Sequence, residues 1–385
     1  MMRILEVITL GETGGAQTVL VDLIKGISAG GYDVEIDVVF GPGDYLPLAF
    51  TSWFQGQAIQ VPWLSRSINP YKDIMVLAKL WQLCKTRKYD IVHCHSSKAS
   101  WLARLAASWA GVPRICMTVH GLSFHPGNPP LIRQVYQRIE KVAIPFANEY
   151  VFVSPKDLVE MKALGLDNSR CRYIPNGRSI PPYPIVGLRD LLPIPKEAPI
   201  ICMVARLSKV KNPMAFLRVA KIVTKKYPSN LPIPNFILIG SGPMYEECQK
   251  AVAKADLTNR VHVMGHKVDA GQFFWDADIA FLPSYYEACP LVIIESMATG
   301  TPVVASNVGG TESMVKHGQT GYLFSLEHEE EAAQHIINLS INSKMREEMG
   351  KSALKHYQKE FSVEIMVDNY VKHLGLQKIK AGHYE

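Results

Sequence analysis

The chain has 385 residues, of which 48% are hydrophobic and 20% are charged, and its formal net charge is +6. This length exceeds one ordinary core and suits two domains of about 150–200 residues. The composition excludes a disordered or collagen-like chain and is that of a soluble globular protein. The small positive excess is weak evidence for an anionic partner and gives no indication of nucleic acid.

The first half of the chain alternates short apolar runs with stretches of helical spacing. A glycine loop at 11–15 follows the first apolar run, and a helical pattern follows the loop. Such alternation predicts a parallel sheet covered by helices. The predicted strands of this half are residues 3–9, 34–40, 90–95, 115–119 and 150–153.

A proline-rich stretch at 175–199 interrupts this alternation. Its density of proline excludes a helix and stiffens the backbone, so we place the linker between two domains there. The prolines of the stretch are Pro175, Pro181, Pro182, Pro184, Pro193, Pro195 and Pro199.

A second alternating series begins after the linker. Residues 214–223 and most of 328–360 have helical patterns, and 363–375 predicts an amphipathic helix. The predicted strands are 200–204, 236–239, 261–264, 279–282 and 302–305.

These patterns predict an α/β protein with two doubly wound, Rossmann-like domains. We expect an N-terminal domain at 1–188 and a C-terminal domain at 189–362, with the last helix, about 363–385, packing back on the first domain. Ligands of such sheets bind at the carboxyl ends of the strands. We therefore expect the site in a cleft between the two domains.

The cysteines and the apolar runs bear on the compartment. The seven cysteines form no C-x-x-C pair, which favours reduced thiols and no zinc site. No apolar run approaches the roughly 20 residues that span a bilayer, and the N-terminus resembles a core strand rather than a secretory signal. We expect a cytoplasmic protein.

The segment at 283–305 carries the strongest chemical signal. Glu287 follows a predicted strand, and Glu295 lies in the helix that Pro290 is expected to start. Leu291 and Val292 follow Pro290 at the expected N-terminus of this helix. Their backbone amides can bind an anion such as a diphosphate. A carboxylate accepts hydrogen bonds from two vicinal hydroxyls, so Glu287 suits a sugar and Glu295 suits a ribose.

This segment resembles the E-x7-E signature of the retaining glycosyltransferase family 4, whose fold is called GT-B. Here Ala288-Cys289-Pro290 stands where the family more often has Gly-Phe-Gly. Residues 204–212 are similar to the stretch in which an arginine and a lysine grip the donor diphosphate, and Arg206 and Lys211 stand at those places. Ala205 and Asn212 replace glycines that are usual there.

Further stretches match the family in the same order. The turn at Gly240 resembles the family's strand-to-helix turn, and Gly14-Gly15 resembles its loop facing donor phosphate and acceptor. His120 ends a predicted strand where family members carry a histidine that faces the donor sugar. By this resemblance Glu287, His120, Arg206 and Lys211 are the expected catalytic residues.

Two patterns suggest metal ions, and we expect neither to bind one. His93 and His95 flank Cys94, but adjacent residues of a strand point to opposite faces. Asp276-Ala277-Asp278 resembles the metal motif of a different glycosyltransferase fold, but it directly precedes a predicted core strand.

A helical stripe in the first half has two interpretations. Its apolar residues are accompanied by Arg133, Arg138 and Lys141. The ordinary interpretation is a core face with solvated cations, and the alternative is a helix resting on an anionic bilayer. The stripe consists of Leu131, Ile132, Val135, Tyr136, Ile139 and Val142.

The resemblance implies a retaining, metal-independent glycosyltransferase without a cofactor. A hexose or an N-acetylhexosamine would pass from a nucleotide-sugar, expected to be a UDP-sugar, to a glycan or a polyprenyl-diphosphate-linked saccharide in surface polysaccharide synthesis, for example of capsule or O-antigen. That acceptor makes the inner face of the plasma membrane a further expected partner. The alternatives are a UDP-sugar 2-epimerase of the same fold and a non-catalytic sugar-nucleotide-binding subunit.

Overall fold

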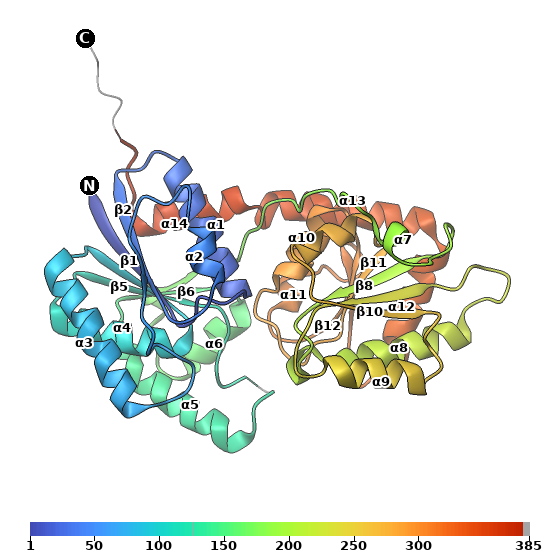
Figure 1. Ribbon diagram of the computed structural model, residues 1–385, viewed down its shortest axis with the longest axis horizontal. Coiled ribbons are helices and arrows are strands. Elements are labelled where there is room, and N and C mark those ends of the chain that lie inside the picture. Colours follow the sequence, from blue (N-terminus) through green and yellow to red (C-terminus); the bar gives the residue numbers. More distant parts are fainter. Residues whose placement is uncertain (126, 380–385) are drawn as a thin grey trace, which may run out of the picture. The chain divides into compact units, whose positions relative to one another are not determined.

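A computed structural model describes residues 1–125 and 127–379 and divides the chain into two compact units (Figure 1). The first unit contains Met1–Gly177 and the residues from Val363 onward, and the second contains Arg178–Ser362. The chain thus passes from one unit to the other twice. The first passage lies inside the proline-rich stretch and before position 188, where the sequence analysis divided the chain.

The first unit is built on a seven-stranded sheet within the described residues, and all its strands are parallel. Its central strands are mostly buried, as expected of strands covered on both faces, although β1 and β4 also carry polar side chains. The order is β3-β2-β1-β4-β5-β6-β7, with β1 (Met2–Ile8), β2 (Val34–Phe40), β3 (Ala58–Gln60), β4 (Ile91–His95), β5 (Arg114–Val119), β6 (Glu149–Phe152) and β7 (Cys171–Tyr173).

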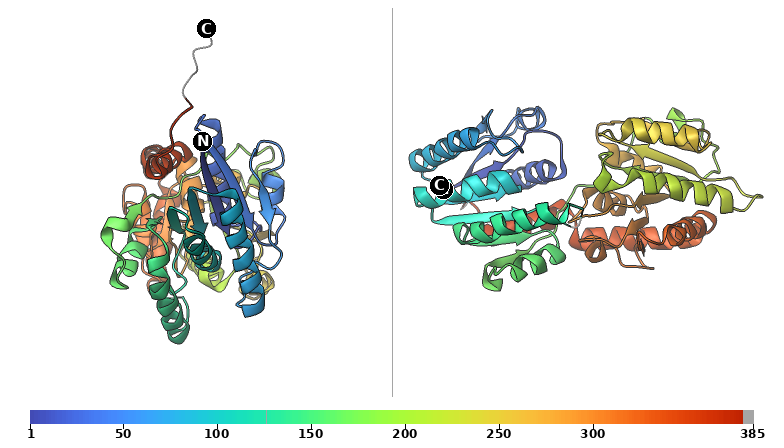
Figure 2. Two further views of the ribbon diagram at one scale, coloured as in Figure 1. Left: turned by 90° about the vertical axis from the view of Figure 1, so that its left-hand side faces the viewer. Right: turned by 90° about the horizontal axis from the view of Figure 1, so that it is seen from below.

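Helices cover both faces of this sheet (Figure 2). They are α1 (Gly15–Ala29), α2 (Tyr45–Ala49), α3 (Pro70–Arg87), α4 (Ser97–Ala110), α5 (Pro130–Ala143), α6 (Pro155–Ala163) and α14 (Val363–Leu374).

Helix α14 comes from the far end of the chain and lies beside α1 (Figure 1). Its buried residues recur at helical spacing, and Val367 packs so closely on Gly26 that a Cβ there would lie 2.4 Å from Val367 Cγ2. Arg114 donates hydrogen bonds to the carbonyl oxygens of His373 and Leu374, at 3.1 and 2.8 Å, and so caps the end of α14.

The second unit contains a six-stranded parallel sheet among the described residues, in the order β10-β9-β8-β11-β12-β13. Its strands are β8 (Ile200–Val204), β9 (Asn235–Ile239), β10 (Val261–Gly265), β11 (Ile279–Leu282), β12 (Val303–Ser306) and β13 (Gly321–Phe324). Its helices are α7 (Leu188–Leu191), α8 (Pro213–Lys226), α9 (Tyr245–Lys254), α10 (Leu291–Ala298), α11 (Thr311–Met314), α12 (Glu329–Ile341) and α13 (Ser343–Glu360).

The strand order reverses once in each sheet. The reversal falls between β1 and β4 in the first unit and between β8 and β11 in the second. Connections leave such a point in opposite directions, which opens a crevice at the carboxyl ends of the two strands. Residues on the loops after these strands are therefore the candidates for ligand binding.

The predicted α/β class with two parallel sheets is confirmed, and two details differ from the sequence analysis. The short strands β3, β7 and β13 were not predicted. The stretch at 175–199 contains one helical turn, α7, so the prediction that its prolines exclude a helix was wrong. No proline lies within Leu188–Leu191, and Asp276 Oδ2 accepts a hydrogen bond from the Leu188 amide at 2.6 Å.

All seven cysteines are buried, and no disulfide joins them within the described residues. They are Cys84, Cys94, Cys116 and Cys171 in the first unit and Cys202, Cys248 and Cys289 in the second. Of the helices in the described parts of the chain, none has the length and hydropathy that a bilayer-crossing segment requires.

A buried ion pair ties α4 to α5 in the first unit. Arg104 is inaccessible to solvent, and its guanidinium lies 3.2 Å from Glu140 Oε2 and 2.9 Å from the Tyr150 hydroxyl oxygen. Glu140 is itself only 6% exposed. Each member depends on the other, because a buried charge without a partner is strongly destabilising.

We predict that Arg104→Met lowers the free energy of unfolding by about 3–5 kcal/mol, because Glu140 then stays buried without its cation. Urea unfolding followed by circular dichroism measures the loss. Lys351→Met is the control, since Lys351 pairs with Glu347 on the surface, and it should leave the unfolding curve almost unchanged. Equal effects of the two substitutions would contradict the prediction.

Candidate active site

The loop after β8 carries the two predicted cations, Arg206 and Lys211. Lys211 ends a short 3-10 helix, Lys209–Lys211, and Asn212 follows in the left-handed conformation, with φ 52°. Asparagine tolerates this conformation better than most residues, and its Oδ1 accepts a hydrogen bond from the Ala215 amide at the start of α8. Asn212 therefore takes over the backbone role of the glycine that is usual there.

Lys211 reaches across the switch point to Glu287 on the loop after β11. Its Nζ lies 2.6 Å from Oε1 and 2.8 Å from Oε2 of the carboxylate. The Ser284 hydroxyl also donates to Oε1, at 2.7 Å, and Glu287 is 5% exposed. The structure thus joins two of the predicted site residues in one tightly held ion pair.

The backbone around Glu287 is fixed as well. The Glu287 carbonyl accepts a hydrogen bond from the Gly310 amide at 2.8 Å, and a Cβ on Gly309 would lie 1.8 Å from the same oxygen. Tyr285 donates its amide to the Val210 carbonyl at 2.8 Å, which links the two loops directly. The position of the carboxylate is therefore set by backbone contacts as well as by Lys211.

Arg206 lies on the same loop as Lys211 but is exposed. No hydrogen bond or ion pair of its guanidinium is found within the described residues. An exposed guanidinium in this position is available to an anionic ligand, whereas Lys211 is already neutralised by Glu287.

Gly240 brings the loop after β9 against the loop after β8. Its φ is +141°, and a Cβ would lie 1.9 Å from the Ala205 carbonyl oxygen. Both facts require glycine here. Because Gly240 has no side chain, its backbone packs directly against Ala205, the residue before Arg206.

Helix α10 starts beside these loops and carries Glu295. Pro290 is the N-cap residue rather than the first helical residue, so the helix begins one position later than expected, at Leu291. The amides of Leu291 and Val292 are in its first turn, where no carbonyl of the helix can accept from them. Glu295 is 9% exposed, and its Oε1 lies 3.0 Å from Arg178 Nε.

The predicted residues of the first unit lie at the carboxyl ends of β1 and β5. Gly14 is the N-cap of α1, and Gly15 is the first residue of that helix. His120 directly follows β5. The two groups of predicted residues thus belong to different units.

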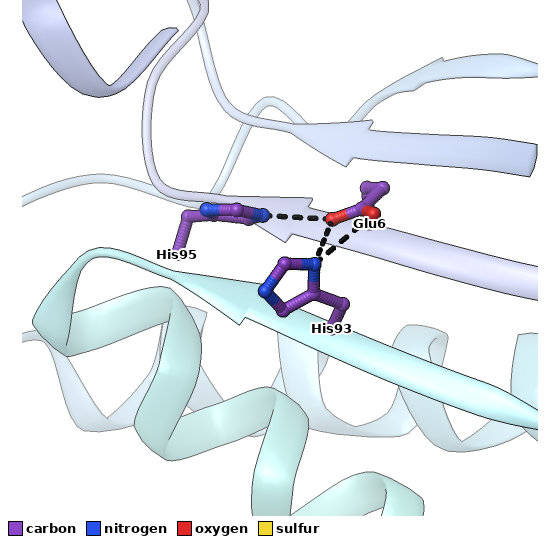
Figure 3. Close-up of side chains that lie close together, drawn as sticks. All are labelled: Glu6, His93 and His95. Atoms are coloured by element: carbon purple, nitrogen blue, oxygen red, sulfur yellow. Dashed lines mark hydrogen bonds and ion pairs between the residues drawn. The ribbon is translucent and has the colours of Figure 1, made fainter. Parts of the chain in front are cut away.

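His120 is half-buried and ends a chain of hydrogen-bonded side chains that begins inside the sheet. Glu6 on β1 contacts both His93 and His95 on β4: its Oε1 is 3.1 Å from His93 Nδ1, and its Oε2 is 2.7 Å from His95 Nε2 (Figure 3). His95 Nδ1 lies 2.9 Å from His120 Nε2. Sequence reasoning missed Glu6, although a glutamate inside an apolar strand was a usable signal.

The buried charges of this chain are coupled. Burial acts to raise the pKa of Glu6, but the charge and hydrogen bonds of His93 and the bond from His95 outweigh it and lower that pKa. Burial acts to lower the pKa of His93, and the charge of Glu6 raises it above its ordinary value. Burial and the charge of His93 lower the pKa of His95, and burial chiefly lowers that of His120. These directions favour the charged forms of Glu6 and His93 and disfavour the charged forms of the other two imidazoles.

Within residues 1–125 and 127–379, two groups have ligand atoms close enough to hold a metal ion. One is Glu6 with His93 and His95, and the other is Cys116 with Glu149 and His373. The sequence analysis separated the histidines from Cys94 by strand alternation, but His93 and His95 are two residues apart and point to the same face. Mutual hydrogen bonds occupy the Glu6 oxygens and the facing imidazole nitrogens, so this donor set has an explanation without a metal ion.

The aspartates of the rejected metal motif have structural contacts. Asp276 accepts a hydrogen bond from the Leu188 amide, and Asp278 accepts one from the Ile200 amide at 2.8 Å. Asp278 also pairs with Arg346 at 3.0 Å. These two aspartates therefore fix the backbone at Leu188 and Ile200, near the start of the second unit.

Two sequence families match the chain. Residues 13–180 match the family described as Glycosyltransferase Family 4, and residues 188–356 match Glycosyl transferases group 1. A curated Escherichia coli relative, "UDP-Gal:alpha-D-GlcNAc-diphosphoundecaprenol alpha-1,3-galactosyltransferase", is 30% identical over 332 residues, which cover 84% of each chain. A Campylobacter jejuni relative, "N,N'-diacetylbacillosaminyl-diphospho-undecaprenol alpha-1,3-N-acetylgalactosaminyltransferase", is 25% identical over 80% of this chain and 82% of its own.

Solved structures share the fold. The crystal structure of Anabaena HepE in complex with UDP and glucose matches with a TM-score of 0.81 at 20% identity, covering 97% of this chain and all of HepE. A sucrose-phosphate synthase from Thermosynechococcus elongatus matches with a TM-score of 0.78 at 21% identity, covering 97% of this chain and 98% of its own. With two parallel sheets, matching families along both units and a relative of this similarity, the chain belongs to glycosyltransferase family 4 and is a glycosyltransferase of the GT-B fold.

Proposed function

We propose that the chain transfers a hexose or an N-acetylhexosamine from a UDP-sugar to a sugar carried on polyprenyl diphosphate, with retention of the anomeric configuration. The names of the Escherichia coli and Campylobacter jejuni relatives both specify an acceptor on undecaprenyl diphosphate. The first also specifies UDP-galactose, and the HepE crystals contain UDP. These names support the donor and acceptor classes, and we propose surface polysaccharide synthesis as the context.

The observation that carries the proposal is the ion pair of Lys211 and Glu287 at the switch point of the second sheet. A cation and a carboxylate lie there within reach of one ligand, beside the first-turn amides of α10. Cations and helix-start amides suit a diphosphate, and a carboxylate suits sugar hydroxyls. A nucleotide sugar contains both groups in one molecule.

In this proposal the donor diphosphate binds Arg206, Lys211 and the amides of Leu291 and Val292. Glu295 accepts hydrogen bonds from the ribose, and Glu287 accepts them from the transferred sugar. The two cations neutralise the charge that develops on the leaving diphosphate, a role that Mg²⁺ has in other phosphate chemistry.

The transfer itself needs no protein nucleophile. The bond between C1 of the sugar and the diphosphate oxygen breaks, and the acceptor hydroxyl bonds to C1 from the same face. The hydroxyl proton passes to the departing phosphate oxygen, so the products are UDP and the extended acceptor. In the first unit, Gly14 and Gly15 leave room for the substrates, and His120 accepts a hydrogen bond from a sugar hydroxyl.

The face of α5 supports a membrane-bound acceptor. Leu131, Val135 and Val142 are 73%, 48% and 61% exposed, so the interpretation of this stripe as a core face was wrong. Only Glu140 and Ala143 of α5 are buried, and Arg138 and Lys141 are exposed alongside the apolar residues. We propose that this face rests on an anionic bilayer, where apolar residues insert and cations meet the headgroups.

We predict that UDP raises the thermal stability of the chain and that Lys211→Met removes most of this effect. A ligand at 100 times its dissociation constant stabilises by about 2.7 kcal/mol, and loss of a diphosphate contact weakens binding. Thermal unfolding with and without UDP measures the difference. Lys209→Met is the matched control, because Lys209 is an exposed cation on the same loop. An equal loss in both variants would show that only net charge matters.

Glu287→Ala is predicted to lower kcat by about 10²–10³ or more, because the transferred sugar loses its carboxylate partner. The assay follows radiolabelled sugar from a panel of UDP-sugars into an acceptor on polyprenyl diphosphate. Circular dichroism must show an intact fold. Turnover equal to that of the unchanged chain would remove Glu287 from the site, and release of an epimerised UDP-sugar without acceptor would replace transfer by epimerisation.

The membrane face gives a separate prediction. Leu131→Glu should weaken binding to vesicles that contain phosphatidylglycerol by roughly tenfold or more. The substitution removes a leucine whose transfer into the bilayer contributes about 1.5–3 kcal/mol, and it adds a negative charge that the anionic lipid repels. Cosedimentation measures the binding. Val159→Glu is the control, because Val159 is 63% exposed on α6 of the same unit but lies outside this face. Unchanged binding of Leu131→Glu would exclude α5 as the contact.

A further inference from the structure

We propose that Glu6 and His95 are positioning residues for His120. They hold its imidazole in the tautomer that carries the proton on Nε2, so that the Nδ1 lone pair is left to accept a hydrogen bond from a substrate hydroxyl. The assignment of the tautomer rests on the contacts of the first unit alone. The identity of the hydroxyl as that of a sugar substrate rests on the proposed function.

The direction of the hydrogen bonds is set at Glu6. The ionised carboxylate can only accept, so both imidazole nitrogens that face it must carry protons. These are His93 Nδ1, at 3.0 Å from Oε2, and His95 Nε2, at 2.7 Å from the same oxygen. Glu6 has no accessible surface, so no water competes for these positions.

His93 balances the charge of Glu6 and leads away from His120. Its second nitrogen, Nε2, lies 2.8 Å from the Thr118 hydroxyl oxygen, which lies 2.9 Å from the Tyr370 hydroxyl oxygen on α14. As an imidazolium, His93 donates from both nitrogens. The single negative charge of Glu6 is thus neutralised by His93, and His95 is not needed as a cation.

The protonation of His95 determines which atom donates in its hydrogen bond with His120. With its one proton on Nε2, neutral His95 has a lone pair on Nδ1, and this atom lies 2.9 Å from His120 Nε2. A hydrogen bond forms only if His120 Nε2 is the donor. The neutral His120 ring then has no proton on Nδ1, which is an acceptor.

His120 Nδ1 is buried and has no hydrogen-bond partner among the described residues. Buried polar atoms are paired in the great majority of cases, so an unpaired acceptor requires an explanation. A ligand hydroxyl provides it, whereas a carbonyl or a phosphate oxygen cannot, because neither donates. The low basicity of this imidazole also fits an atom that orients a hydroxyl without removing its proton.

The tautomer can be read directly from the resting protein. In long-range ¹H–¹⁵N correlation spectra of the intact chain labelled at histidine, we expect His120 to show a protonated Nε2 and an unprotonated Nδ1. The His120→Phe spectrum identifies its signals by their loss. A protonated Nδ1, or a charged imidazolium at neutral pH, would overturn the inference.

Two substitutions of His95 test the positioning role. His95→Phe removes the acceptor for His120 Nε2, so His120 should exchange between tautomers and kcat should fall about 10- to 100-fold, as for other orienting contacts. The KM for the donor should change far less than kcat. His95→Asn retains an oxygen close to the place of Nδ1, and we expect it to restore both the tautomer and most of kcat. His356→Phe, a buried imidazole of the second unit, is the control for general effects.

The outcomes separate this inference from the proposed function. If no UDP-sugar is transferred by any form of the chain, the proposed function fails, and the spectrum of the resting protein still decides the tautomer. If transfer occurs but His95→Phe leaves kcat and the tautomer unchanged, the positioning role is refuted. Stoichiometric metal in the purified chain that is lost in Glu6→Gln would also overturn it, because a metal ion would displace the proton of His95 Nε2.

Discussion

The ion pair of Lys211 and Glu287 connects the two loops at the switch point of the second sheet, and the candidate donor site depends on it. A carboxylate that is only 5% exposed needs a cation, because a buried unpaired charge is costly. The same lysine is the expected partner of the donor diphosphate. In the proposed reaction the two anions share Lys211, and the Ser284 hydroxyl holds the carboxylate in place while its other oxygen turns to the sugar. The ion pair of the ligand-free protein thus already holds both side chains near the positions that the proposed donor site requires.

The sequence was sufficient to predict the fold class and to identify the loops that carry Lys211 and Glu287. Alternating apolar runs identify buried parallel strands, and motif order places each loop after its strand. The strands β3 and β7 have three residues each, too few for a period to be recognised, whereas β13 was missed although β6, β11 and β12 are equally short and were predicted. The face of α5 failed for another reason: helical spacing shows that a face exists but not what covers it. The partners of Glu6 depend on the order of β1, β4 and β5 in the sheet, which no local pattern contains.

Departures from the family's usual residues are explained by local backbone geometry. Asn212 adopts the left-handed conformation that glycine usually provides and also caps α8. Pro290 precedes α10 instead of opening it, which leaves the first-turn amides of Leu291 and Val292 to a ligand.

The burial of every cysteine has a practical consequence for studies of this chain. Burial raises the pKa of the Cys84 thiol to about 12 and that of Cys248 to about 11, so almost no thiolate is present at neutral pH. An alkylating reagent therefore reacts only after the surrounding structure opens, and its rate reports that opening. Because four of these residues belong to one unit and three to the other, mass spectrometry of the labelled peptides gives a separate opening rate for each half of the enzyme without any engineered probe.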